Sequence, residues 1–379
     1  MNNIIKTLVF VMTLALVLVA FTGCDLEQEI NNKKCELYGH TIEIIGEKLA
    51  TCTEDGHSAG AICSVCGYVE RNCFILEAKG HDEVVIAGKK PTCTEAGTTD
   101  AVECNRCHEI LEEATEVAAT GHTFGEADEL GTKICSECQV AGVTTGLGMG
   151  AALKAKHDVL LLNDIVIDPA VESNAYGITG INVDYGQTID GNNFTLTVNG
   201  ANGTWDTGIN TTGGLIKNIT VTGSFRGIFI NHTSDHSEMV VLENVTITGT
   251  VYTISVDQAV GQGLKAINCT INGWTSFAAT LGNAEFVNCT FGIGDYKFAR
   301  PYAPTTFTNC TFAEGFDGVD CTKTTGIVFD GCKLGDADLT ADNAADLIIG
   351  TATLNGVECH VHNFVEGSCA CGESETVDQ

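Results

Sequence analysis

Proline, aromatic side chains and positive charge are all scarce in this sequence. Only 4 of the 379 residues are proline and 7% are aromatic, whereas 43 are glycine. Lysine and arginine number 19 against 49 acidic residues, which gives a formal net charge of −30. That balance argues against nucleic acid and anionic membrane surfaces as partners, because both require a basic surface. The composition is typical of a turn-rich β protein that is soluble outside the cell.

Long hydrophobic runs are also missing after the first 20 residues, so no later segment is long enough to span a bilayer. Residues 1–24 contain one early lysine and an apolar run from Leu8 to Ala20, which is the pattern of a secretion signal. The closing Phe21-Thr-Gly-Cys24 resembles a bacterial lipobox, and that resemblance implies a lipid on Cys24. Ordinary cleavage nearby, leaving Cys24 unmodified, is the alternative. We therefore expect an exported protein that is lipid-anchored to the cell membrane and faces the extracellular side.

A short phrase recurs through the second half of the chain: Asn, an apolar residue, Thr and another apolar residue. Its column of Asn residues has steps of 20 to 26 residues and ends at Gly331; the column comprises Asn193, Asn218, Asn244, Asn268, Asn288 and Asn309. Apolar residues that flank an outward Thr predict a strand with one buried face. Strands this close, with no helical stretch between them, exclude a βαβ crossover and fit the coils of a parallel β-helix. We expect the Asn side chains to form a hydrogen-bonded ladder along its axis.

This column, together with Gln187-Thr-Ile-Asp-Gly-Asn-Asn-Phe-Thr-Leu196, resembles the right-handed parallel β-helix proteins of the pectate-lyase-like superfamily over roughly residues 147–357. The resemblance implies a mainly β fold, a single-stranded right-handed solenoid of about eight to nine coils. It says little about activity, because one architecture hosts many chemistries. A short helix over Ala151–Lys156 is expected to cap the first coil, since an open end would expose unpaired backbone groups.

A second repeat, with a period of 41 residues, precedes the solenoid: Gly39-His40, Gly80-His81 and Gly121-His122 open three copies. Each of the first two copies holds three spaced Cys and one His. An odd number of thiols cannot close on itself as disulfides, but it completes a tetrahedral Cys3His zinc shell. The predicted ligands are His40, Cys52, Cys63, Cys66, His81, Cys93, Cys104, Cys107, His122, Cys135 and Cys138.

Several points about this repeat stay open. A disulfide framework and free thiols are the alternatives to zinc, because the protein is expected to be exported. His81 can close either the first copy or the second. The third copy lacks the Thr-Cys-Thr-Glu segment, and we interpret Cys35 and Cys73 as lying outside the pattern. His57 and His108 break the period and are interpreted as surface residues. A 41-residue unit with so few large apolar residues favours metal, whose binding supplies folding free energy.

The phrase Pro91-Thr-Cys-Thr-Glu-Ala-Gly97, followed by Cys-x-x-Cys and Ala119-Thr-Gly-His122, resembles short His/Cys repeats on surface proteins of anaerobic gut Firmicutes. The resemblance implies a zinc-ribbon-like spacer or display module without catalytic activity. A compact fourth copy at the C-terminus offers the ligands Cys359, His362, Cys369 and Cys371. The expected organisation is a signal peptide (1–24), a tether (25–38), Cys/His repeats (39–142), the β-helix (143–357) and a C-terminal module (358–379).

Catalytic residues are hard to find in the solenoid. A β-helix lyase needs acidic residues that hold Ca²⁺ and a basic catalyst, and a hydrolase needs paired carboxylates. The candidates are Asp317, Asp320 and Arg300, while the Asn-x-Asp, Asp-Asp, Gly-His-Gly and Arg-x-Lys motifs of polygalacturonases are absent. The column Cys269, Cys289, Cys310 and Cys332 alternates with Thr as apolar residues do in earlier coils, so we interpret it as small apolar filler.

These observations lead to one expectation and two alternatives. We expect a non-catalytic surface protein whose solenoid binds an extended ligand, above all a polysaccharide, or another ligand on a host or cell surface. Trp205, Tyr252, Trp274 and Tyr296 are the expected sugar-stacking platforms. The alternatives are a polysaccharide lyase or glycoside hydrolase, and a structural stalk. Zinc is the expected cofactor, and Ca²⁺ would be needed only by a lyase.

Overall fold

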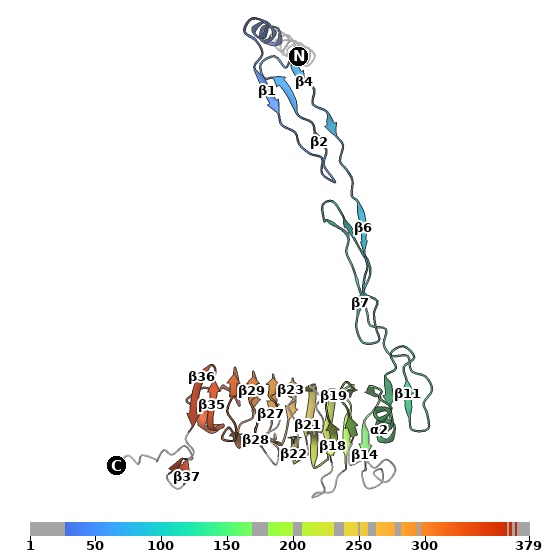
Figure 1. The fold of residues 1–379 in the computed structure, drawn as a ribbon, viewed down its shortest axis with the longest axis vertical. Helices are drawn as coiled ribbons and strands as arrows, with labels where there is room; N and C mark the ends of the chain where they lie inside the picture. The colour runs from blue at the N-terminus through green and yellow to red at the C-terminus, as the bar shows by residue number, and fades with distance from the viewer. Residues whose placement is uncertain are drawn as a thin grey trace, which may run out of the picture. The chain divides into compact units, whose positions relative to one another are not determined.

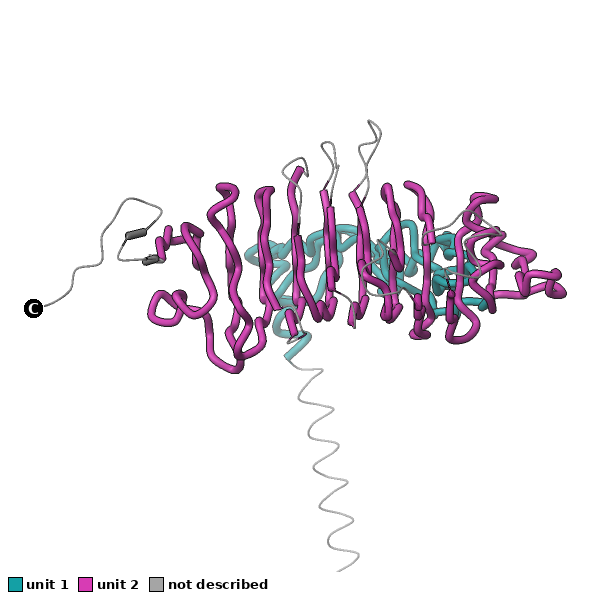
Figure 2. The backbone as a smooth tube through the Cα atoms, turned by 90° about the horizontal axis from the view of Figure 1, so that it is seen from below, with its two compact units in different colours: residues 1–121 teal, residues 122–379 magenta. Residues whose placement is uncertain are grey.

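The computed structural model describes residues 27–168, 181–199, 207–230, 239–248, 251–256, 263–276, 282–292, 294, 297–361, 364–365 and 368–369. The chain divides into two compact units, residues 1–121 and residues 122–379, which are teal and magenta in Figure 2. The lipidation candidate Cys24 lies outside the described residues.

The first unit repeats one small antiparallel motif. Residues 27–38, part of the expected tether, are helical. Two three-stranded sheets follow, β1-β3-β4 and β6-β8-β9, and their registers are equivalent one repeat apart: Ile42 pairs with Cys63, and Glu83 pairs with Cys104. The strands are β1 (Ile42–Ile45), β2 (Gly56–His57), β3 (Gly60–Cys63), β4 (Val69–Arg71), β5 (Ile75–Leu76), β6 (Glu83–Ile86), β7 (Gly97–Thr98), β8 (Ala101–Cys104), β9 (Ile110–Glu112) and β10 (Glu116–Val117).

This unit has almost no apolar core. Its described buried hydrophobic residues are cysteines and two alanines, Ala50 and Ala61. Large aliphatic side chains face solvent instead, as Ile44 does in β1 (75% exposed) and Val85 does in β6 (62% exposed). Burial at about 25 cal/mol per Å² therefore contributes little here, so the unit requires another source of stability.

The second unit begins with the third Cys/His copy. Its strands β11 (Thr132–Ile134) and β12 (Ala141–Val143) are antiparallel, and β12 continues in parallel with the first solenoid strand, β13 (Val159–Leu161). Helix α2 (Gly146–Lys154) starts at Thr145, whose hydroxyl accepts a hydrogen bond from the Gly148 amide. Its buried Met149 and Leu153 join the solenoid core at that end, so the expected cap exists and begins five residues earlier than Ala151.

The rest of the unit is a parallel β-solenoid, as predicted, whose rungs are seen side by side in Figures 1 and 2. Its elements are β14 (Ile165–Ile167), β15 (Ile181–Val183), β16 (Thr188–Asp190), β17 (Thr195–Val198), β18 (Thr207–Thr211), β19 (Gly214–Thr222), β20 (Arg226–Ile230), β21 (Val240–Thr248), β22 (Tyr252–Val256), β23 (Leu264–Ile267), β24 (Thr270–Ile271), β25 (Trp274–Ser276), β26 (Ala284–Val287), β27 (Thr290–Phe291), β28 (Phe298–Arg300), β29 (Thr305–Thr308), β30 (Thr311–Phe312), β31 (Gly318–Asp320), β32 (Ile327–Asp330), β33 (Lys333–Leu334), β34 (Ala337–Asp338), the 3-10 helix η1 (Ala344–Asp346), β35 (Ile348–Leu354) and β36 (Val357–Val361).

The solenoid has about six turns, fewer than the eight or nine expected. The expected count included residues 346–357 as a last coil, where β35 pairs antiparallel with β36. At the C-terminal end β33 pairs antiparallel with β34, and β35 pairs antiparallel with β36. Two further strands, β37 (Phe364–Val365) and β38 (Ser368–Cys369), form a separate antiparallel pair.

Like residues stack inside the solenoid. Phe286, Phe307 and Phe329 are stacked in one column, with successive ring centroids 5.2 and 4.9 Å apart. The cysteine column is buried beside them, from Cys269 (2% exposed) to Cys332 (2% exposed). Each of these thiols donates to backbone carbonyls; the Cys289 Sγ, for example, lies 3.4 Å from the oxygens of Ala266 and Val287. The interpretation of these cysteines as small core residues is therefore confirmed.

Four residues of the Asn column, Asn218, Asn244, Asn268 and Asn288, form the expected ladder. Asn244, Asn268 and Asn288 each donate from Nδ2 to the Oδ1 of the Asn one coil earlier, at 3.0, 3.3 and 3.3 Å. Asn218 donates to Asp190 at 3.1 Å, so an aspartate rather than Asn193 begins the hydrogen-bonded series. All six Asn of the column have a left-handed backbone, with φ between 51° and 66°, and Gly331 shares it at 60°. The column selects Asn for two reasons, its side-chain amide and its tolerance of this conformation.

Candidate metal sites

Three Cys-x-x-C turns in the chain have the same backbone geometry. In each, the amide after the second Cys donates to the carbonyl of the first, from Gly67, His108 and Gln139, at 2.8–3.0 Å. These three residues have a left-handed backbone with φ of 76°, 59° and 62°. Such a turn directs both thiols to one side, as the predicted metal-binding knuckle requires.

The first site gathers Cys35, His40, Cys63 and Cys66, whose ligand atoms all lie within 4.8 Å of one another. The Sγ atoms of Cys35 and Cys63 are 3.6 Å apart, and the Sγ of Cys66 is 3.3 Å from Nδ1 of His40. Tyr68 stacks on the His40 ring at 4.4 Å and restricts its orientation. Our interpretation of Cys35 as lying outside the pattern was wrong, because the helix over residues 27–38 delivers it to this site.

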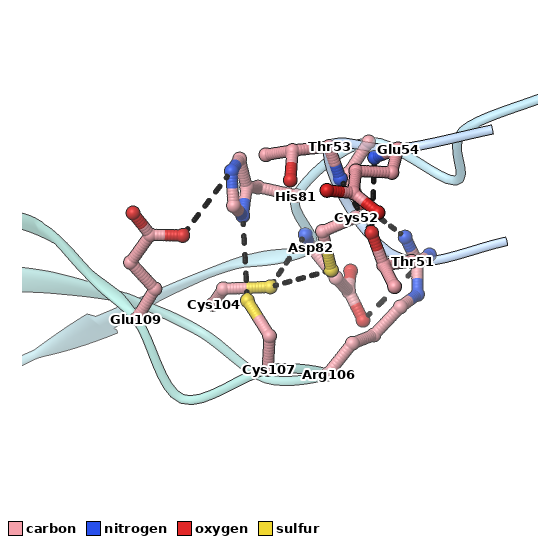
Figure 3. Close-up of polar contacts among 11 residues, drawn as sticks. Thr51, Cys52, Thr53, Glu54, His81, Asp82, Cys104, Arg106, Cys107 and Glu109 are labelled. Carbon is pink, nitrogen blue, oxygen red and sulfur yellow. Dashed lines mark hydrogen bonds and ion pairs between the residues drawn. The ribbon is translucent and has the colours of Figure 1, made fainter.

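The second site gathers Cys52, His81, Cys104 and Cys107 (Figure 3). The Sγ atoms of Cys52 and Cys104 are 3.6 Å apart, and the Sγ of Cys107 is 3.6 Å from Nδ1 of His81. The other ring nitrogen of His81 faces the Glu109 carboxylate at 3.8 Å. A carboxylate behind a ligating His is the usual means of fixing its ring and tautomer. His81 thus belongs with the Cys-x-x-C pair that follows it, which settles the point that the sequence left open.

Cys52 therefore belongs to the site of the next copy, and backbone hydrogen bonds explain this assignment. The turn that carries it, Thr51 to Glu54, is closed by the Thr51 side chain, which accepts from the Glu54 amide at 2.9 Å. The carbonyls of Thr51 and Cys52 accept from the amides of Lys79 and Gly80, at 2.9 and 3.0 Å. Gly80 directly precedes His81, so these two bonds place Cys52 beside the next copy's histidine. Our expectation that Cys52 shares a site with Cys63 and Cys66 was wrong for this reason.

The third copy repeats the arrangement. Within the second unit the Sγ of Cys138 lies 3.3 Å from Nδ1 of His122, Cys135 is buried, and Phe124 stacks on the His122 ring at 5.4 Å. Within the first unit Cys93 sits in a turn like that of Cys52, and its carbonyl accepts from the amide of Gly121 at 3.1 Å. Cys52 precedes His81 by 29 residues, and Cys93 precedes His122 by 29. The repeat spacing thus predicts Cys93 as the fourth ligand of the third copy.

The sequence contained a signal that each Thr-Cys-Thr-Glu cysteine belongs to the site of the following copy. Cys35 is one cysteine too many at the start of the repeats, and the third copy is one cysteine short at their end. Shifting each Thr-Cys-Thr-Glu cysteine forward by one copy removes both discrepancies. The histidines that break the period stay outside the sites: His108 is exposed and pairs with Glu103 at 2.7 Å, and His57 belongs to none of the described groups.

Local electrostatics favour one thiolate in each knuckle. Burial raises the pKa of Cys63, but the amides of Cys66 and Val65 and the His40 ring lower it to about 5. Cys104 has the same balance, with amides of Asp82, Cys107 and Arg106 and the His81 ring lowering its pKa to about 5. Burial first, and then the neighbouring thiols, raise the pKa of Cys35 to about 12. A cation at the centre would reverse this last effect, because thiolates bind metal ions directly.

The distances between the ligand atoms fit a tetrahedrally coordinated metal ion. With metal–sulfur bonds of about 2.3 Å and metal–nitrogen bonds of about 2.0–2.1 Å, a tetrahedron has S···S edges of about 3.8 Å and S···N edges of about 3.5 Å. The contacts given above are 3.6 Å for S···S and 3.3–3.6 Å for S···N. None of the described cysteines is joined in a disulfide. The groups are therefore able to hold three metal ions, all with soft ligands.

The C-terminal copy is described only in part. Cys359 lies half-buried on β36, and the backbone of Cys369 lies in β38. His362 and Cys371 fall outside the described residues. Cys73, the other cysteine that we placed outside the pattern, is exposed and donates to the Ser58 carbonyl at 3.1 Å.

The three catalytic candidates do not form a free acid and base pair. Nε of Arg300 lies 3.2 Å from Oδ2 of Asp320. Burial raises the pKa of Asp320, but hydrogen bonds from the hydroxyl and amide of Thr322, then Lys323 and Arg300, bring it below its usual value. Asp320 is therefore ionised at neutral pH and already neutralised by its neighbours. Asp317 is exposed on the loop before β31.

Two of the aromatic candidates are described, and they pack on each other. Tyr252 and Trp274 stack with centroids 5.1 Å apart, and the Arg300 guanidinium lies 5.6 Å from the Trp274 ring centre. Neighbours thus occupy ring faces that a sugar would need. Trp205 and Tyr296 lie outside the described residues.

No helix among the described residues is long and apolar enough to cross a membrane. Comparison with known proteins adds no identity: no family model, curated protein or solved structure matches this chain.

Proposed function

We propose that this is an exported cell-surface protein, anchored through a lipid on Cys24, whose solenoid binds an extended polysaccharide without cleaving it. In this proposal the chain is a surface lipoprotein of the pectate-lyase-like β-helix class, carrying zinc-ribbon-like spacer repeats. The observation that carries it is the run of in-register parallel rungs, for example Ile219 with Val245 and Val221 with Ile247. Stacked rungs form a long sheet surface that repeats at about 4.8 Å, which suits a ligand with a repeating structure of its own.

Zinc is the metal that we propose for the Cys/His sites. Three thiolates and one imidazole in a tetrahedral arrangement are typical ligands of a closed structural zinc site. The cysteines of the first two sites come from separate segments, such as the helix over residues 27–38 and the turn at Cys63–Cys66. The role that follows is to fold the repeats, which bury so little apolar surface. Such sites leave no open coordination position for catalysis.

The non-catalytic form is favoured over a lyase or hydrolase by the Arg300–Asp320 ion pair. A lyase base must be able to accept a proton, and a hydrolase acid must be protonated at its working pH. The Arg300 guanidinium is engaged by the Asp320 carboxylate, and the lowered pKa of Asp320 disfavours it as an acid. The proposal therefore assigns no role to Ca²⁺.

The test uses the purified protein without its leader, incubated with a panel of neutral and acidic polysaccharides. Retention on the polysaccharide is measured together with new unsaturated or reducing ends. We expect retention without new ends. New ends that disappear in the Asp320→Ala variant would establish the enzyme instead, and no retention on any polysaccharide would leave the structural stalk.

A further inference from the structure

One surface of the solenoid consists of threonines in a single line. Thr195, Thr220, Thr246, Thr270, Thr290 and Thr311 lie in register on successive coils, each directly paired with the next. Each of them stands two residues after the Asn of its coil. In the first three of these coils a second Thr stands two residues on, at Thr197, Thr222 and Thr248. We name the surface formed by these nine residues the threonine face.

The hydroxyls of this face have no hydrogen-bond partner among the described residues. All nine side chains are half-buried or exposed, and none makes a side-chain hydrogen bond to another residue of the described chain. Buried threonines of the solenoid are different. The hydroxyls of buried Thr253 and Thr275 bond to each other at 2.9 Å, and that of buried Thr305 donates to Ala303 at 2.8 Å. The threonine face is therefore a set of donors and acceptors that point outward.

The threonine column is also uncharged over six coils, until Lys333 takes its place beside Thr311. Charge is present on the residues that precede the Asn of each coil, where Lys217 pairs with Asp190 at 3.4 Å and Lys265 pairs with Glu285 at 3.2 Å. A polyanion would find no cation on the face and would meet a chain of net charge −30. A polycation would find no carboxylate there. The face therefore suits a neutral ligand that is rich in hydroxyl groups.

The spacing is regular in both directions. Hydrogen-bonded strands are about 4.8 Å apart, and residues two apart on a strand are about 6.6 Å apart, so the hydroxyls form a flat lattice. Threonine is stiff at χ1, so little side-chain freedom is lost when a ligand binds. An extended polysaccharide is a straight polymer that carries hydroxyl groups on every sugar residue. It can therefore make the same contact with each successive coil.

We propose that the threonine face is the binding surface for a neutral, extended polysaccharide that lies along the solenoid axis. This inference rests on the proposed function and adds to it the surface and the ligand class. Each hydroxyl contributes one modest hydrogen bond, and the contacts add up because they are simultaneous.

The test compares two triple variants of the protein. Thr220→Val/Thr246→Val/Thr270→Val removes three adjacent hydroxyls and keeps the β-branched shape. The matched control is Thr188→Val/Thr306→Val/Thr308→Val, which alters three half-buried threonines on strands that precede the Asn ladder, with hydroxyls likewise unpaired among the described residues. Circular dichroism and the melting temperature verify that both fold like the parent. The probes are cellulose, chitin and soluble β-glucan as neutral polymers, and polygalacturonate as the acidic one.

The face variant should bind the neutral polymers at least about tenfold more weakly, at a net worth of roughly 0.5 kcal/mol or more per hydroxyl, while the control binds like the parent. Equal binding by the parent and the face variant would overturn the threonine face and leave the proposed function intact. Binding of polygalacturonate alone would overturn the neutral ligand class. If the parent binds none of the polymers, the proposed function fails together with this inference.

Discussion

Sγ of Cys52 lies 3.6 Å from Sγ of Cys104, a residue 52 positions further along the chain. The contact joins two consecutive repeats, because Cys52 follows the first histidine and Cys104 follows the second. A metal ion at this point is therefore a cross-link between repeats as well as the centre of one. The ligand assignments can be tested one site at a time.

Replacing Cys52 by Ser should disrupt the second site and spare the first. We expect Cys104 and Cys107 to become reactive to iodoacetamide in the zinc-loaded variant, while Cys63 and Cys66 stay protected. Mass spectrometry of the alkylated peptides measures this. The control is Cys73→Ser, which lies outside the sites. Loss of protection at Cys63 and Cys66 instead would show that each copy keeps its own cysteine.

Removing the metal should unfold the first unit and leave the solenoid folded. The first unit buries little apart from its ligands, and structural zinc contributes on the order of 10 kcal/mol to the folding of comparably small domains. The solenoid core contains stacked Phe, Ile and Val side chains that need no ion. After treatment with a chelator, a protease should cleave within residues 27–121 and spare residues 146–361. A protease-resistant first unit without metal would contradict this.

The Asn ladder makes a prediction in two steps. Asn244→Gly keeps the left-handed backbone, at φ 54°, and loses the two side-chain bonds, which should cost about 1–2 kcal/mol of unfolding free energy. Asn244→Ala loses the same bonds and adds a backbone penalty of about 1 kcal/mol. Urea denaturation of both variants should therefore rank Ala as the less stable. Equal stabilities would mean that the conformation is not what selects Asn here.

Asp320 should stabilise the fold only above acidic pH. Its pKa in the folded state is lowered, so its contribution is fully present above the unfolded value of about 3.9 and is lost as the pH falls through the folded value. Asp320→Asn should be less stable than the parent at pH 7, and the difference should shrink toward pH 3. Urea midpoints at the two pH values measure this. Asp317→Asn, which removes a carboxylate at an exposed position, serves as the matched control for the change in net charge.

The sequence was sufficient to predict the solenoid, because its signals are local. An inward residue such as Ile247 and an outward one such as Thr246 are distinguished by their order alone. The Cys-x-x-C knuckles were predictable for the same reason. The path of the chain between them was not: nothing in the spacing shows that the Thr51 and Cys52 carbonyls bond to Lys79 and Gly80. Those long-range backbone bonds determine which histidine receives which cysteine.

The start of the Asn ladder was missed for a related reason. Asn193 shares the column and its backbone conformation, yet the Asn218 side chain reaches Asp190 instead. Residues 190 to 193 form a tight turn, in which the Asp190 carboxylate also accepts from the Asn192 amide at 2.9 Å. A column drawn from the sequence cannot separate two acceptors that lie three residues apart.

Each Thr-Cys-Thr-Glu cysteine belongs to the site of the following copy. This has a consequence for how the repeat region can become longer or shorter. Because the first two copies have the same spacing, deleting or duplicating 41 residues within residues 39–121 leaves each Thr-Cys-Thr-Glu cysteine 29 residues before a histidine. Unequal recombination within the gene would therefore create or remove a complete site and never half of one. The number of repeats can therefore change by whole copies. Genes that differ by whole multiples of 41 codons should all encode proteins whose Cys/His sites are complete.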